Sequence, residues 1–139
     1  SIIAKLDALG RGFEDALLLD ENGFVAEATG ENLFIVSKGA LITPPTDNTI
    51  EGITRASVMD IARDEKIPLR EQHITREALY SADEAFITGT AAEITPLSSI
   101  DGKKISTGKP GALTKRMQSL YSDAIHGKIP RYEKWLSYA

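Results

Sequence analysis

The chain has 139 residues, of which 42% are hydrophobic and 26% charged, and it carries a formal net charge of −4. These values are typical of one ordinary globular domain, and scattered basic residues argue against a nucleic-acid-binding face. The absence of cysteine excludes disulfides and thiolate chemistry, and no apolar run is long enough to span a membrane. With no signal peptide visible, we expect a cytoplasmic protein.

The first part of the chain predicts one helix followed by hairpins. Residues 1–9 have a helical apolar spacing that leaves Lys5 on the polar side; the apolar positions are Ile2, Ile3, Leu6 and Leu9. Strands are expected at 15–20 and 24–28, joined by the hairpin signal Asn22-Gly23, and then at 32–36 and 40–43. The double proline at 44–45 should stop the last of these strands.

The remaining elements alternate between helices and strands. Thr54 is a plausible N-cap for a helix over 54–66, and Thr75 for a short helix carrying Leu79. Strands are expected at 69–73, 85–88, 93–100 and 103–106, followed by a helix over 112–126 that Gly127 ends and an irregular tail over 130–139. Hairpins mixed with helices predict a mixed α/β domain with a largely antiparallel sheet.

Three stretches have residue types that suit a ligand, although each has a simpler structural explanation. Small residues follow the strand that reaches Gly89, and Thr90 adds a hydroxyl, yet a tight hairpin would look the same. Residues 51–55 open a helix whose first N–H groups favour an anion, and every capped helix shares this property. Glu27 lies between two alanines on a strand, where an exposed position is the plainer interpretation.

Taken in order and spacing, the segments 25–34, 51–55 and 87–96 resemble the cofactor-binding segments of fold-type IV pyridoxal-phosphate enzymes. The branched-chain amino acid aminotransferases are the most similar group, and the resemblance runs from Asp15 to the end of the chain. It implies the C-terminal large domain of that fold, a pseudo-barrel with packed helices. The sequence departs from the family at Glu51, where a proline is frequent, and this should alter loop stiffness more than chemistry.

The resemblance implies a role for individual residues around pyridoxal 5'-phosphate. Glu27 would pair with the pyridine nitrogen and favour the protonated ring, Gly30 would allow close backbone approach, and Ile50 would lie against the ring. The phosphate would be bound by Ile53 and Thr54 with help from Thr90. The substrate carboxylate would be received by Gly89, Thr90 and Ala91, whose neutral amides do not trap the reactive amine. Asn32 would hold its turn, and Glu31 is treated as structural.

A transaminase also needs a lysine that forms a Schiff base with the cofactor. The family lysine precedes the position of Ser1, and Lys5 is rejected because it lies on the polar side of the expected helix. We therefore expect residues 1–139 to be a C-terminal cofactor-binding domain without its N-terminal domain, inactive alone. Expected partners are the N-terminal part of the same enzyme and a second copy in a homo-oligomer, with no nucleic acid or membrane.

The implied reaction is transfer of an amino group between Leu, Ile or Val and 2-oxoglutarate. Alternatives are a D-amino acid aminotransferase or an aminodeoxychorismate lyase of the same fold, or a non-catalytic domain that only binds a partner. His73 and His126 lack further ligands at suitable spacing, so no metal site is expected.

Overall fold

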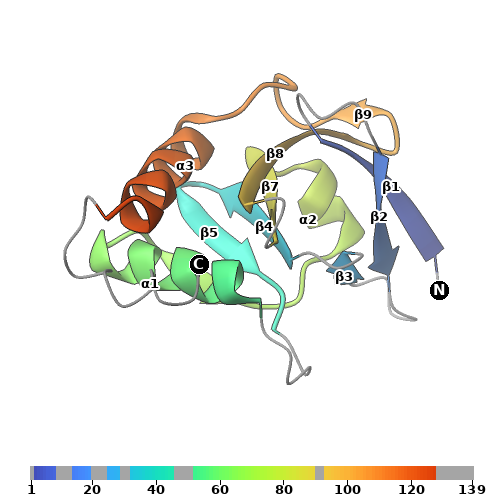
Figure 1. Ribbon diagram of the computed structural model, residues 1–139. Helices are drawn as coiled ribbons and strands as arrows, with labels where there is room; N and C mark the ends of the chain where they lie inside the picture. Colours follow the sequence, from blue (N-terminus) through green and yellow to red (C-terminus); the bar gives the residue numbers. More distant parts are fainter. Residues whose placement is uncertain are drawn as a thin grey trace.

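The computed structural model describes residues 2–8, 14–19, 25–28, 32–45, 52–89 and 93–127, with side chains from residue 32 onward. Its strands form one sheet in the order β3-β2-β1-β8-β7-β4-β5-β6, and β9 pairs with β8. Neighbouring strands are antiparallel except for β5 and β6 (Figure 1). The elements are β1 (Ile2–Ala8), β2 (Glu14–Leu19), β3 (Val25–Ala28), β4 (Asn32–Ser37), β5 (Ala40–Thr43), α1 (Ile53–Asp64), β6 (Leu69–Glu71), α2 (Arg76–Tyr80), β7 (Glu84–Gly89), β8 (Glu93–Ile100), β9 (Lys103–Lys104) and α3 (Ala112–Ile125). The predicted mixed α/β class with a largely antiparallel sheet is confirmed.

Two apolar cores lie on opposite faces of the central strands. Because strand side chains alternate, β4 sends Leu33 and Ile35 to the core shared with α2, and Phe34 and Val36 to the core shared with α1 and α3. The helices accordingly cover both faces of the sheet (Figure 1). Phe34 lies opposite Phe86 in the register, and their rings stack with centroids 5.1 Å apart. Burial on both faces explains why these strands are nearly continuous apolar runs.

The prediction of a helix over 1–9 was wrong. Residues Ile2–Ala8 form β1, which pairs with β2 on one side and with β8 on the other. The short run contains two β-branched residues at its start, and pairing on both edges outweighs a helical spacing that spans barely two turns. Lys5 therefore lies opposite Ala16 in a strand, and the helix argument against Lys5 no longer applies.

The other expected elements are present, with small shifts at their ends. Strands β5 and β8 match the predicted bounds, and Thr75 caps α2 by accepting a hydrogen bond from the Ala78 N–H. Thr54 is not an N-cap, because α1 begins at Ile53 and Gly52 takes the cap position. The hairpin signal at 22–23 and the tail over 130–139 lie outside the described residues.

Helix α3 is capped by a side chain from a distant strand. Glu84, the first residue of β7, accepts hydrogen bonds from the backbone N–H of Leu113 at 3.2 Å and of Thr114 at 2.7 Å. A Cβ at Gly111 would overlap the Glu84 side chain, so the N-cap position must be glycine for the carboxylate to fit. The carboxylate satisfies first-turn donors and complements the helix dipole, which ties α3 to the sheet.

Replacing Glu84 by Ala should lower the free energy of unfolding by about 1–2 kcal/mol, the usual effect of removing a cap. Chemical denaturation of the intact protein measures this difference. Lys115→Ala, at an exposed position on the same helix, is the matched control and should change stability by less than about 0.5 kcal/mol. Equal effects of the two substitutions would show that Glu84 does not cap α3.

Candidate functional site

The first turn of α1 differs from that of the other helices in the described part of the chain. Thr75 caps α2 and Glu84 caps α3, whereas the N-cap of α1 is Gly52, which offers no side chain. The first N–H groups of α1 have no partner within the helix, and they carry the positive end of its dipole. Ile53, the first helical residue, is 62% exposed, so this end of α1 reaches the surface. The arrangement is suited to an anion.

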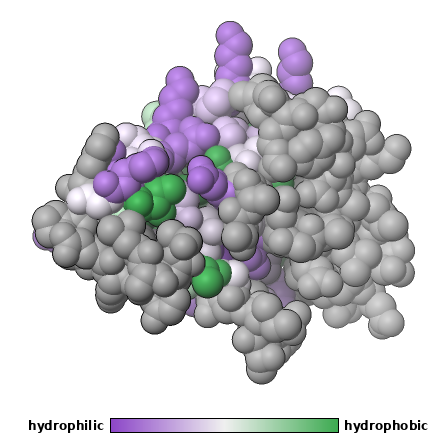
Figure 2. All heavy atoms as spheres, viewed as in Figure 1, coloured by the Kyte–Doolittle hydropathy of each residue, from purple (hydrophilic) through white to green (hydrophobic). Residues whose placement is uncertain are grey.

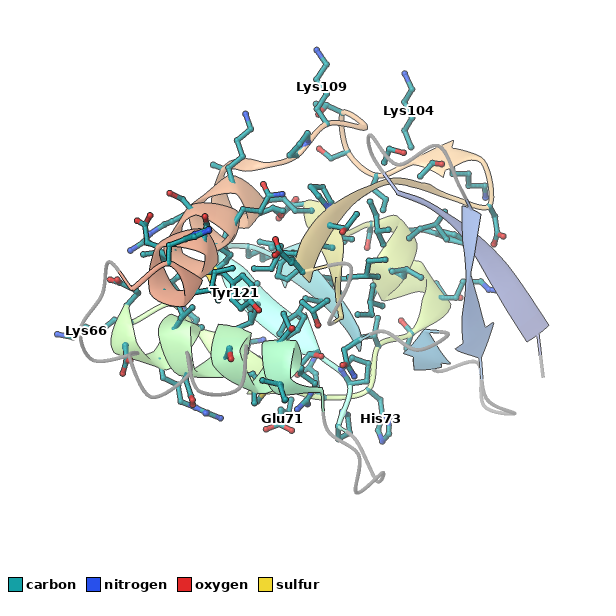
Figure 3. All side chains as sticks on the ribbon, viewed as in Figure 1. Lys66, Glu71, His73, Lys104, Lys109 and Tyr121 are labelled. Atoms are coloured by element: carbon teal, nitrogen blue, oxygen red, sulfur yellow. The ribbon has the colours of Figure 1, made fainter. Side chains whose placement is uncertain are left out.

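Thr54 joins this helix end to two other elements. Its side-chain hydroxyl donates to the carbonyl oxygen of Gly89 at 3.4 Å, at the end of β7, and lies 3.5 Å from the Tyr121 hydroxyl of α3. Tyr121 lies between α3 and α1 (Figure 3). Thr54 is 5% exposed, so the contacts form inside the protein and fix the start of α1 against the sheet. Two predicted site residues, Thr54 and Gly89, are thereby brought together.

Asn32 and Thr88 complete this corner from neighbouring strands, where they face each other in the register. A Cβ built on Gly52 would lie 2.7 Å from Asn32 Oδ1, so the asparagine amide packs directly against the N-cap of α1. The Thr88 hydroxyl is fully buried and has no hydrogen-bond partner among the described residues. Alternation places Thr88 on the same face as Phe86, toward α1 and α3. A buried hydroxyl of this kind is a donor that a ligand can use.

Sequence reasoning missed Thr88, Tyr121 and the contact between Asn32 and Gly52. Thr88 stands directly before the glycine that was singled out, and its position two residues after a core phenylalanine was the available signal. Tyr121 was assigned to the apolar stripe of α3, where it is half-buried as expected. Its hydroxyl contact depends on how α3 crosses α1, which the sequence of one helix does not specify.

The remaining predicted site residues are not tested by the structure. Glu27 lies in β3 opposite Leu18, next to a register shift, and its side chain is not described. The other predicted positions, Gly30, Ile50, Thr90 and Ala91, lie outside the described residues. The expected convergence of Glu27, Thr54 and Thr90 on one concave face therefore stays a prediction.

Charged groups elsewhere have local structural roles. A hydrogen bond to Asp101 raises the pKa of Tyr80, with burial adding to the effect, and this pair lies apart from the site, where α2 meets the β8–β9 turn. No group of three or more His, Asp or Glu residues in the described part could hold a metal ion. None of the described helices is long and apolar enough to cross a membrane. On the face shown in Figure 2, apolar described residues appear as isolated spots among polar ones.

A mixed sheet with an anion-binding helix end beside the end of a central strand agrees with what comparison with known proteins shows. The family model for amino-transferase class IV matches residues 1–100, and the chain belongs to this family. The chain is 48% identical over 139 residues to a probable branched-chain-amino-acid aminotransferase of Aquifex aeolicus, covering 99% of this chain and 45% of that protein. The chain thus spans less than half the length of this relative.

Solved structures agree with the sequence relatives. The branched-chain amino acid aminotransferase of Thermobaculum terrenum superimposes with a TM-score of 0.82 at 42% identity, covering 89% of this chain and 41% of that one. The branched-chain aminotransferase of the archaeon Thermoproteus uzoniensis, solved with norvaline, gives a TM-score of 0.81 at 48% identity, covering 90% and 41%. At these identities the shared fold reflects a shared family.

Proposed function

We propose that residues 1–139 form the cofactor-binding domain of a pyridoxal-phosphate-dependent branched-chain aminotransferase. The enzyme would transfer the amino group between Leu, Ile or Val and 2-oxoglutarate. The observation that supports this most is the start of α1, which lacks a side-chain cap and is held at the end of β7 by Thr54. Related enzymes have been solved with pyridoxamine 5'-phosphate and with 4-methylvaleric acid, a branched apolar acid.

The donors at the start of α1 fit the phosphate end of this cofactor. The N–H groups of Ile53 and Thr54 would donate to phosphate oxygens, and Thr90 would add its hydroxyl. The buried Thr88 hydroxyl, without a partner in the described part, supplies a further polar group at this corner. Neutral donors and a helix dipole hold a dianion without a fixed positive side chain, which leaves room for a cation from another part of the enzyme.

The rest of the cofactor and the substrate would be held by residues on β3 and after β7. The cofactor supplies an electron sink for negative charge at the substrate carbon. Glu27 would keep a proton on the ring nitrogen, Gly30 would admit the ring edge, and Ile50 would cover the ring face. The backbone of Gly89, Thr90 and Ala91 would bind the substrate carboxylate. We further propose a cytoplasmic homo-oligomer, on the basis of the family resemblance.

The intact enzyme that contains this chain is the proper test. Purified with pyridoxal 5'-phosphate, it should convert L-leucine, L-isoleucine and L-valine in the presence of 2-oxoglutarate, measured as glutamate formation. Amino transfer from D-alanine, or pyruvate release from aminodeoxychorismate, would instead identify one of the alternative enzymes. Absence of all three reactions, in a protein that folds and contains a lysine ahead of residue 1, would favour a non-catalytic binding domain.

A further inference from the structure

Arg55 is the largest fully buried side chain in the described part of the chain, with an exposure of 1%. It lies in the first turn of α1, directly after Ile53 and Thr54. Burial of a guanidinium group is costly unless its donors are paired, and a cation near a helix N-terminus is also unfavourable for the helix dipole. A residue kept here against both costs needs a compensating role.

The contacts of Arg55 connect three elements through one nitrogen. Nη2 donates to the carbonyl oxygen of Pro44 at 3.2 Å and to Glu71 Oε2 at 3.3 Å. Pro44 directly follows β5, and Glu71 is the last residue of β6, which pairs in parallel with β5. Glu71 lies below the N-terminal end of α1, and its side chain is 45% exposed (Figure 3). The first turn of α1 is thereby tied to the ends of both parallel strands.

These contacts lie on both sides of the segment 46–51. Pro44 precedes this segment, and Arg55 follows it within the first helical turn. Thr54 holds the opposite side of the same turn against Gly89. The direction of the first N–H groups of α1 is therefore set from two sides, by a hydroxyl toward β7 and by a guanidinium toward β5 and β6.

We propose that Arg55 and Glu71 form a positioning pair that holds the first turn of α1 in the orientation needed to bind a phosphate group. This inference rests on the proposed function, because it assigns the pair to the phosphate end of that site. Arg55 acts through the backbone of Ile53 and Thr54, and Glu71 acts by keeping the Arg55 side chain in place.

A purely electrostatic role would have the opposite sign. The Glu71 carboxylate adds negative charge near the anion site, so removing it without any structural effect would strengthen phosphate binding. Its exposure means that water and salt weaken this effect. Loss of a hydrogen bond to a charged group is the larger change, and it corresponds to about tenfold in a binding constant. The sign of the change therefore separates positioning from charge.

Binding of pyridoxal 5'-phosphate and of pyridoxal to the intact enzyme tests the pair. Both compounds carry the same aldehyde, so the ratio of their dissociation constants isolates the phosphate end. We expect Glu71→Ala to weaken the binding of pyridoxal 5'-phosphate about tenfold and to leave that of pyridoxal nearly unchanged. Glu71→Gln retains an acceptor oxygen and should restore most of the loss. Glu71 is chosen for substitution because its exposed end makes unfolding less of a risk than at Arg55.

The matched control is Glu65→Gln, which removes a carboxylate at the C-terminal end of α1. Glu65 pairs with Arg116 at 3.6 Å, far from the first turn of the helix. It should not change the ratio. An unchanged or improved ratio in Glu71→Ala, or equal weakening of both compounds, would overturn the proposal. A wild-type enzyme that does not prefer the phosphorylated compound would instead overturn the proposed function itself.

Discussion

Glu27→Gln in the intact enzyme should lower the transamination rate by at least about a hundredfold, which is about 2.7 kcal/mol in activation free energy. A carboxylate beside the ring nitrogen favours the protonated ring, whereas an amide gives no such preference. The electron sink weakens, but the phosphate contacts at α1 are unaffected. The measurement is kcat with L-leucine, together with the dissociation constant of pyridoxal 5'-phosphate, which should change far less than kcat.

Glu31→Gln is the matched control for this substitution. It removes a carboxylate four residues further along the same segment, at a position that we interpret as structural. It should leave kcat close to the wild-type value. Turnover near the wild-type value in Glu27→Gln would show that Glu27 is not the partner of the ring nitrogen.

The chain expressed alone should have no measurable transaminase activity, even if it folds. A transaminase needs a lysine placed at the cofactor aldehyde. The lysines whose side chains are described are all exposed: Lys38, Lys66, Lys103, Lys104, Lys109 and Lys115. Lys66, Lys104 and Lys109 point away from the protein (Figure 3). None of these six is a buried group at the start of α1.

Borohydride reduction after incubation with pyridoxal 5'-phosphate, followed by peptide mapping, checks this expectation. Labelling should be scattered and low, and addition of the remaining part of the enzyme should restore turnover. Lys5 matters most in the map, because it lies in β1 and not in a helix, which removes the first argument against it. A single stoichiometric label at Lys5 with transamination by the chain alone would contradict the expectation.

The success of the sequence predictions followed the strength of the local signal. Strand β8 and the Thr75 cap of α2 were predictable because alternation and capping chemistry act over a few residues. Segment 1–9 was predicted wrongly because its conformation is decided by two partner strands that are distant in the sequence. Local periodicity contains no information about such pairing.

The candidate site was predictable in part for the same reason. Thr54 and Gly89 were found because each ends or begins an element and precedes or follows small residues. The roles of Glu84 and Arg55 were missed, since each depends on contacts with elements far along the chain. An arginine in the first turn of a helix is read from sequence as a solvated charge, and only packing shows that it is buried.

The pairing of β1 with β8 has a consequence for the order in which the protein folds. Leu6 lies opposite Ile100, whereas β4, β5, α1 and β6 contact one another over short sequence distances. Closing a long loop has an entropic cost that short-range contacts do not share. The parts that hold Thr54 and Arg55 should therefore form early, and the β1–β2–β3 edge that carries Glu27 should dock late. The two ends of the proposed cofactor site would then be assembled at different stages of folding.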